Sequence, residues 1–281
     1  MIIRHDLKLV FLHVPKCAGK ELRELFSHDA RPEHCVSMFN FAYSPVLHRH
    51  VDLAHLPMAD LVHWPEFRWL ESYTTIAAIR NPYERLISAA NEYFRQRSKQ
   101  DEATINTTGI TLDMRRSYFQ QLALQHSQLD PRFVHSLPMT WFTHLGSIPV
   151  VDHLLRCETL ADDVQHLAEQ LDLPASIRSE AAQRLRNNPS RQTVEGLSPD
   201  EIELAHALYP QDFGTFGYSR QRVPCPPTPN SDLGLELLNP STTTKSHAIP
   251  ILSRAERVDW HWGPSSIRQE PSNLPPTRDC H

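Results

Sequence analysis

Leu9-Val-Phe-Leu-His-Val-Pro-Lys-Cys-Ala-Gly-Lys-Glu-Leu-Arg-Glu-Leu-Phe26 changes its apolar periodicity halfway along. The apolar run from Leu9 to Val14 is short and typical of a strand that is covered on both faces. Pro15 ends this strand, because proline cannot donate a hydrogen bond to a neighbouring strand. From Lys20 onward, apolar side chains recur on one helical face at Leu22, Leu25 and Phe26. The pattern therefore predicts a buried strand, a short turn and a helix.

The predicted turn has the features of an anion site. Backbone N–H groups at the start of a helix are free, the helix dipole is positive there, and Lys16 and Lys20 add positive charge. We therefore expect the turn to bind a phosphate or sulfate ester. The ATP-binding loop G-x-x-x-x-G-K-[ST] is different, because its last hydroxyl holds magnesium. Here Glu21 stands at that position and Val14 replaces the first glycine, so a magnesium–nucleotide site is not favoured.

A second strand followed by a helix is predicted between residues 73 and 94. Residues 74–79 are β-branched or small, as in a buried strand, and Asn81 and Pro82 form a helix start signal. This order places Arg80 at the carboxyl end of a strand, where α/β sheets bind their ligands. The guanidinium fork of Arg80 suits an ester phosphate, and the hydroxyl of Ser88 can complete the cradle.

Both predicted anion-binding segments resemble motifs of the sulfotransferases that use 3′-phosphoadenosine 5′-phosphosulfate (PAPS). Val14-Pro-Lys-Cys-Ala-Gly19 is similar to their 5′-phosphosulfate loop, P-K-[TC]-[AG]-G-T-S. Arg80-Asn-Pro-Tyr-Glu-Arg-Leu-Ile-Ser88 is similar to their 3′-phosphate motif, R-N-P-[YW]-[DE]-R-[LF]-x-S. Residues 208–218 resemble the closing helix of the carbohydrate-sulfotransferase branch, and residues 130–136 match a further family segment loosely. The resemblance extends over residues 7–220.

The resemblance implies an α/β fold, namely a P-loop-like three-layer sandwich whose central parallel sheet is flanked by helices. It also implies a transferase that moves a sulfuryl group from PAPS to a hydroxyl acceptor, with a carbohydrate as the expected acceptor. Lys16 would hold the bridging oxygen, on which negative charge develops, and no metal is needed. The implied cofactor-binding residues are Lys16, Cys17, Ala18, Gly19, Lys20, Glu21, Arg80, Ser88 and Arg191.

The acceptor hydroxyl needs a base, and histidine has a pKa close to working pH. Three histidines lie between the two motifs, at His50, His55 and His63. The segment His55-Leu-Pro-Met-Ala-Asp-Leu61 resembles the H-x-x-x-x-[ED]-[IL] segment that carries the base in related enzymes. We therefore take His55 as the first candidate for the catalytic base and His50 as the second.

The residues after Gly19 leave two other functions open. Lys20 and Glu21 stand where the family has threonine and serine, so two hydroxyl contacts to the phosphate are missing. One alternative is a P-loop-type nucleotide kinase built on the same strand, loop and helix. The other is a non-catalytic relative that binds adenosine phosphates without turnover.

Composition narrows the classes of partner. The chain has 281 residues, a formal net charge of −5 and a pI near 6.4, which argues against general nucleic-acid binding. Its apolar runs fall short of the roughly 20 residues that a membrane span needs, and we recognise no signal peptide. The five cysteines are few and unpatterned, which favours reduced thiols in a cytoplasmic protein. No spacing of cysteine and histidine suggests a metal site.

The composition changes after residue 220. Ten prolines fall between Pro224 and Pro276, with few long apolar stretches. Such a segment buries too little apolar surface to offset its ordering entropy. We therefore expect a sulfotransferase-like domain over residues 1–220 and a Pro-rich, mostly disordered tail over residues 221–281. Whether the acceptor is a small molecule or a glycan, and which oligomer forms, does not follow from the sequence.

Overall fold

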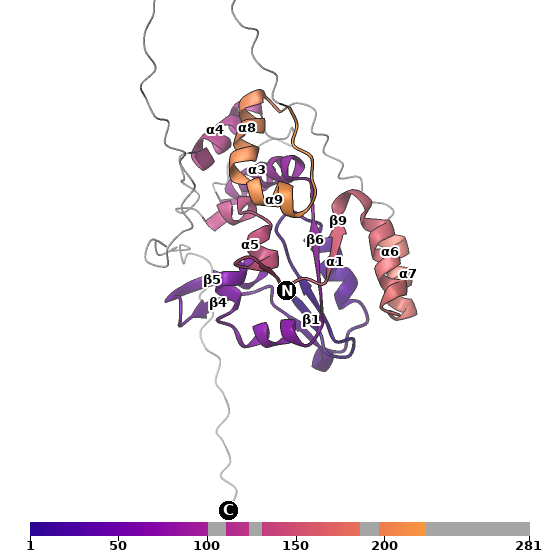
Figure 1. Cartoon of the computed structure of the whole chain (residues 1–281). Coiled ribbons are helices and arrows are strands. Elements are labelled where there is room, and N and C mark those ends of the chain that lie inside the picture. Colours follow the sequence, from indigo (N-terminus) through magenta and orange to yellow (C-terminus); the bar gives the residue numbers. More distant parts are fainter. Residues whose placement is uncertain (101–110, 124–130, 186–196, 223–281) are drawn as a thin grey trace, which may run out of the picture.

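The computed structural model describes residues 1–100, 111–123, 131–185 and 197–222 (Figure 1). Its centre is a sheet made of β1 (Ile2–Arg4), β2 (Leu9–Leu12), β3 (Cys35–Ser37), β6 (Thr74–Ile79) and β9 (His153–Arg156). The strand order is β3-β1-β2-β6-β9. Strand β6 pairs in parallel with both β2 and β9, whereas β1 pairs antiparallel with β2 and β3. The sheet is therefore mixed, with four of its strands pointing the same way.

Helices flank this sheet and form two hydrophobic cores. The first core joins the sheet to α1 (Gly19–Ser27), α6 (Leu160–Gln170) and α7 (Ala175–Arg184). The second core lies among α3 (Pro82–Gln100), α4 (Leu112–Ala123), η5 (Pro131–Ser136), α8 (Pro199–Leu208) and α9 (Pro210–Thr215). The predicted α/β class is thus confirmed. The antiparallel strand β1 was not expected from the sequence, and its turn to β2 is too short for the crossover that a parallel pair requires.

Short elements connect these layers. One of them is a hairpin of β4 (Phe41–Ser44) and β5 (Arg49–Asp52), which extends from the side of the molecule (Figure 1). The helical turns are η1 (Pro32–His34), η2 (Leu53–His55), α2 (Met58–Leu61), η3 (Pro65–Glu71), α5 (Thr140–Thr143) and η6 (Cys157–Thr159). A further short hairpin pairs β7 (His144–Leu145) with β8 (Ile148–Pro149). An extended piece follows residue 48, and a short helix begins after Pro57.

Both predicted strand–helix units are present, with one shifted boundary. Strand β2 ends at Leu12 rather than at Val14, because the chain turns there and the Cys17 N–H donates to the Val14 carbonyl oxygen at 3.3 Å. Strand β6 covers the predicted residues 74–79 and is buried. The Asn81 side chain accepts a hydrogen bond from the Tyr83 N–H at 3.0 Å, which caps α3 at its expected start.

The last helical segment also follows the sequence signals. Ser198 and Glu201 form a capping box at the start of α8, in which each side chain accepts the other's backbone N–H. Glu201 accepts two further bonds, at 2.9 and 3.0 Å, from the Arg115 guanidinium on α4. Arg191 and the predicted tail beyond residue 222 lie outside the described residues. Within the described ranges, no helix has the length and apolarity of a membrane span.

We expect Glu201→Ala to lower the free energy of unfolding by about 3 kcal/mol, because the half-buried Arg115 guanidinium loses its charged hydrogen bonds and α8 loses part of its cap. Urea denaturation measures this change. The matched control is Glu203→Ala, an exposed position on the same helix, which should cost no more than about 0.5 kcal/mol. Equal effects of the two substitutions would mean that the Arg115 contact contributes nothing.

Candidate active site

The loop between β2 and α1 leaves backbone N–H groups available for an anion. Lys16 and Ala18 both have left-handed backbone conformations, with φ of 64° and 53°. The first helical bond of α1 runs from the Leu22 N–H to the Ala18 carbonyl oxygen, so the N–H groups of residues 18–21 precede the helical ladder. The Cys17 N–H is already used by Val14. The arrangement is an anion-binding concavity at the positive end of a helix.

The two residues that depart from the family pattern lie on the first turn of α1. The side chain of Lys20 is exposed, and that of Glu21 is half-buried. Within the described residues, neither side chain makes a hydrogen bond across the loop. The concavity is therefore shaped by the backbone and by Gly19, rather than by these two side chains.

Gly19 is required by the close approach of His13. A Cβ atom on residue 19 would lie 1.8 Å from His13 Nε2 and 1.9 Å from His13 Cδ2. Real Cβ atoms do not come so close to other atoms, so the His13 ring occupies the space that a side chain would take. The glycine therefore serves both the loop and the imidazole that packs against it.

Arg85 holds this loop through hydrogen bonds, although the sequence analysis predicted no role for it. Its guanidinium is fully buried and donates to the Pro15 carbonyl oxygen at 3.0 Å and to the Leu137 carbonyl oxygen at 2.6 Å. It also lies over the ring of Tyr209, 5.7 Å from the ring centre. The available signal was its place in the motif R-N-P-[YW]-[DE]-R-[LF]-x-S, whose second arginine it matches. Arg85 is a positioning residue for the loop.

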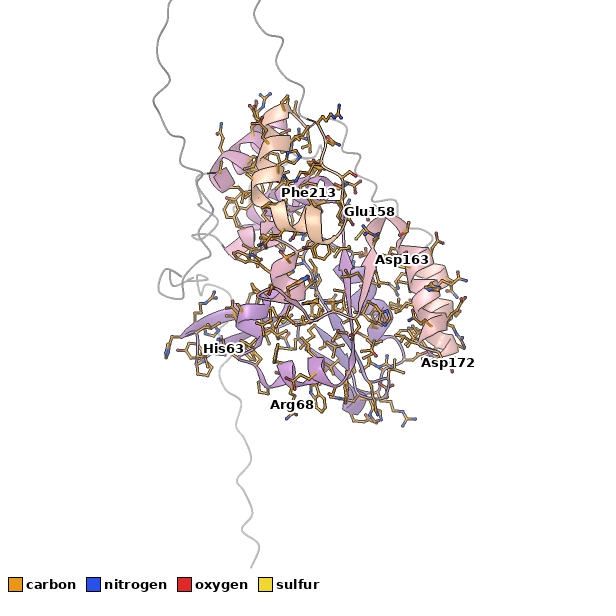
Figure 2. The ribbon with its side chains drawn as sticks, in the orientation of Figure 1. His63, Arg68, Glu158, Asp163, Asp172 and Phe213 are labelled. Carbon is orange, nitrogen blue, oxygen red and sulfur yellow. The ribbon has the colours of Figure 1, made fainter. Side chains whose placement is uncertain are left out.

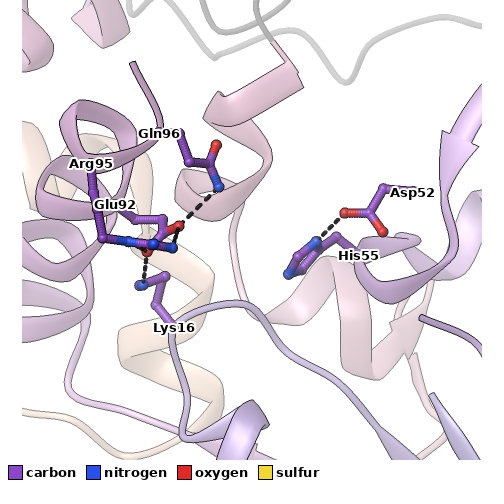
Figure 3. A network of polar contacts seen from close by, with 6 residues as sticks. All are labelled: Lys16, Asp52, His55, Glu92, Arg95 and Gln96. Atoms are coloured by element: carbon purple, nitrogen blue, oxygen red, sulfur yellow. Dashed lines mark hydrogen bonds and ion pairs between the residues drawn. The ribbon is translucent and has the colours of Figure 1, made fainter. Parts of the chain in front are cut away.

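Lys16 extends from the loop to a carboxylate on α3. Its Nζ lies 3.1 Å from Glu92 Oε2, and Arg95 and Gln96 bind the same carboxylate (Figure 3). Burial raises the pKa of Glu92, but the cations of Arg95 and Lys16 outweigh that effect and lower this pKa to about 2. Glu92 is therefore ionised at neutral pH, and it holds Lys16 beside the loop.

The predicted 3′-phosphate residues lie on the same side of α3 as Glu92. Arg80 is 7 % exposed at the end of β6, and its guanidinium binds Glu84 Oε2 at 3.1 and 3.2 Å. Ser88 is half-buried one turn further on, and Glu92 follows after one more turn. Residues four apart are neighbours on a helix surface. The structure thus brings Arg80, Ser88 and Lys16 to one face of α3.

The predicted base candidates occupy different places. His55 ends η2, and its Nδ1 lies 2.5 Å from Asp52 Oδ2 (Figure 3). The centres of the His13 and His135 rings both lie 4.9 Å from the centre of the His55 ring. His50 is exposed on strand β5, and His63 is exposed after α2 (Figure 2). Among the three, His55 is the one that the ring contacts connect to the loop, through His13.

Asp52 sets the orientation and tautomer of His55. A carboxylate only accepts hydrogen bonds, so His55 Nδ1 carries the proton and Nε2 keeps its lone pair when the ring is neutral. Asp52 is itself held by the Ala54 N–H at 2.9 Å. Burial raises the pKa of Asp52, but the hydrogen bond and charge of His55 outweigh it, and the net effect lowers this pKa. Sequence reasoning missed Asp52, although its place three residues before His55 was visible.

The two flanking imidazoles also escaped the sequence analysis. Burial, followed by the neighbouring His55, lowers the pKa of His13 well below its usual value, so His13 is neutral at pH 7. His135 is buried on η5, within the segment that matches the family only loosely. In the part of the chain that the structure describes, no cluster of three or more His, Cys, Asp or Glu residues could hold a metal ion. The rings of His13, His55 and His135 therefore form one packed group.

The closing helix α9 fixes the segment that carries His135. Asp212 is fully buried and accepts hydrogen bonds from the Met139 N–H at 2.8 Å and the Thr140 N–H at 3.0 Å. The Tyr209 hydroxyl donates to the Ser136 carbonyl oxygen at 2.9 Å. Residues near the end of the predicted domain therefore pack against residues 136–140, which follow His135.

This geometry agrees with the comparison of the chain with known families. The family model described as the sulfotransferase family matches residues 1–219, and the chain belongs to that family. The protein is therefore an enzyme, a sulfotransferase. Comparison with curated proteins gave no significant match, and neither did comparison with solved structures.

We expect Gly19→Ala to lower the free energy of unfolding by about 1–3 kcal/mol, because the new methyl group overlaps the His13 ring. Displacement of that ring should also shift the NMR signals of the His55 imidazole. Gly214→Ala is the matched control, since a Cβ there meets no atom within 4 Å and α9 gains a better helix former. A neutral Gly19→Ala substitution would show that the His13 ring moves away at no cost.

Proposed function

We propose that this sulfotransferase moves a sulfuryl group from PAPS to a hydroxyl of a carbohydrate, with His55 as the base. The observation that carries the proposal is the contact between an oriented histidine and an anion-binding loop. His55 is held by Asp52, and it packs on His13, which in turn packs on Gly19 of the loop. Few other pairings of residue types serve both a transferred anion and a hydroxyl acceptor.

The residues of the β2–α1 loop and of one face of α3 fit the two ends of this donor. The N–H groups of residues 18–21 suit the 5′-phosphate, and the missing side chain at Gly19 allows a close backbone approach. Arg80 and Ser88 suit the 3′-phosphate, with Arg191 as a further proposed contact outside the described residues. Lys16 and Arg80 now bind Glu92 and Glu84, so each cation is already positioned before an anion arrives.

In this reaction His55 would act on the acceptor and Lys16 on the donor. His55 Nε2 accepts the acceptor's hydroxyl proton while the oxygen attacks sulfur, and the bond from sulfur to the bridging phosphate oxygen breaks. Lys16 stabilises the charge that develops on this departing oxygen. Asp52 stabilises the resulting imidazolium. In-line transfer of this kind depends mainly on positioning and electrostatics, which the rigid loop and the capped His55 turn provide.

Calorimetry with 3′-phosphoadenosine 5′-phosphate (PAP) tests the donor. We expect the wild-type protein to bind PAP and Arg80→Ala to bind at least 10-fold more weakly, since hydrogen bonds to charged groups contribute about 1.5–3 kcal/mol. Arg178→Ala is the matched control, because Arg178 lies on α7 and is 46 % exposed in its side chain. It should leave PAP affinity unchanged.

The same titration separates this donor from the nucleotide of a kinase. Binding of ATP with magnesium, together with no binding of PAP, would contradict the proposed donor. Equal PAP affinities for wild type and Arg80→Ala would instead show that Arg80 does not bind the donor. Other residues would then have to bind its 3′-phosphate.

Transfer kinetics test the base. We expect His55→Gln to lower kcat by about 100-fold or more, because a positioned base contributes roughly 10²–10⁴-fold, while PAP affinity stays unchanged. Asp52→Asn should lower kcat as well, since the amide does not hold the imidazole in the reactive tautomer. His63→Gln, at the exposed third histidine, is the control and should keep kcat within about threefold. A large loss of kcat in His50→Gln alone would show that His50, and not His55, is the base.

A further inference from the structure

The hairpin of β4 and β5 has one buried face and one outward face. Opposite residues in an antiparallel pair share a face, and successive residues alternate between faces. The buried face carries Ser44 at 2 % exposure and Val51 at 4 % exposure. The register pairs Phe41 with Asp52 and Tyr43 with His50, so these four side chains share the other face.

This outward face presents aromatic rings to solvent. Phe41 is 49 % exposed and Tyr43 is 52 % exposed, although large apolar side chains normally gain free energy from burial. The rings of Tyr43 and His50 pack edge to face, 5.5 Å apart between centres. On the buried face, Arg49 pairs with Asp60 of α2 at 3.3 Å, which ties the hairpin to the body of the protein. The rings are therefore presented by an anchored element.

The outward face includes a residue that contacts the proposed base. Its last residue is Asp52, whose carboxylate holds His55. His50, opposite Tyr43, lies two residues before Asp52, which is roughly 7 Å along a strand. Tyr43, His50 and Asp52 therefore lie on one face of the hairpin, and Asp52 at its end holds His55.

We propose that the outward face of this hairpin is the acceptor platform and that it binds a saccharide chain by stacking. The inference rests on the proposed function, because it takes His55 as the base. Sugar rings have apolar C–H faces that pack on aromatic rings, and hydroxyl groups around their edges that need polar partners. The face offers both, since Phe41 and Tyr43 supply aromatic rings and His50, opposite Tyr43, supplies a polar end.

The composition of the face favours a saccharide over other hydroxyl compounds. An acyl chain needs a continuous apolar groove, whereas here each aromatic ring is paired across the hairpin with a polar group. Stacking of a flat ring on an aromatic side chain contributes about 1–3 kcal/mol in nucleic-acid complexes, and we use that range as a guide. Loss of Tyr43 should therefore change acceptor binding by about 10-fold or more.

The test uses radiolabelled PAPS and the full chain with a panel of acceptors. The panel contains cellohexaose, maltohexaose and desulfated chondroitin, with 1-hexanol and 4-nitrophenol as hydroxyl compounds without a sugar. We expect transfer to at least one saccharide, with Tyr43→Ala raising its KM by about 10-fold or more. Tyr43→Phe should stay within about threefold of wild type, because the ring is kept. Ile148→Ala, at an exposed apolar position of the other short hairpin, should leave KM unchanged.

Two further readouts keep this inference separate from the proposed function. PAP affinity should be the same in wild type and Tyr43→Ala, because the hairpin does not carry the donor residues. Saturation-transfer NMR without any donor should detect the saccharide on wild type and on Tyr43→Phe, and should lose it on Tyr43→Ala. Saccharide binding that depends on Tyr43, combined with no PAP binding, would retain the platform and contradict the proposed donor.

The inference is overturned by any of three results. The first is transfer to a saccharide whose KM does not respond to Tyr43→Ala. The second is transfer to 1-hexanol or 4-nitrophenol and to none of the saccharides. The third is PAP binding by a wild-type protein to which no saccharide of the panel binds in the NMR experiment.

Discussion

The buried guanidinium of Arg85 is the interaction on which the rest of the site depends. A charge without access to water must be surrounded by hydrogen-bond acceptors, and Arg85 finds two of them in separate loops, at Pro15 and Leu137. One of these loops forms the anion concavity, and the other follows the turn that carries His135. A single side chain on α3 therefore ties the anion-binding loop to the segment that follows His135. The Arg85 guanidinium also lies over the ring of Tyr209.

The electrostatics of the loop follow from the same helix. Four side chains at every fourth position, Arg80, Glu84, Ser88 and Glu92, line one face that runs from the end of β6 along α3. Two of them are carboxylates that bind the two cations of the site, so the cations stay ordered while no anionic ligand is bound. Placing Lys16 in this way reduces the side-chain entropy that donor binding would otherwise cost. On the other side of the loop, burial keeps His13 neutral, so this imidazole adds no positive charge next to His55.

The strand–loop–helix units were predictable because their signals are local. The period of the apolar residues, Pro15, and the Asn81-Pro82 start signal all act within a few residues, and the structure reproduces them with a shift of two residues at the end of β2. The antiparallel strand β1 and the hairpin of β4 and β5 were harder, since short strands have little periodicity to detect. Arg85 was visible as the second arginine of the 3′-phosphate motif, but its partners lie on distant loops. Its role could not be inferred from spacing alone.

Read alone, the sequence predicted the family, the α/β class and two phosphate-binding motifs, because each of these predictions depends on residues that are neighbours in the chain. The grouping of His13, His55 and His135, with Asp52 on the His55 ring, arises only after folding. These residues come from β2, η2 and η5 and their flanks. The periodicity of the sequence between them does not predict how close they lie in the folded chain. Contacts of this kind are chosen by how layers pack around a shared core, and that packing is a property of the whole domain rather than of any segment.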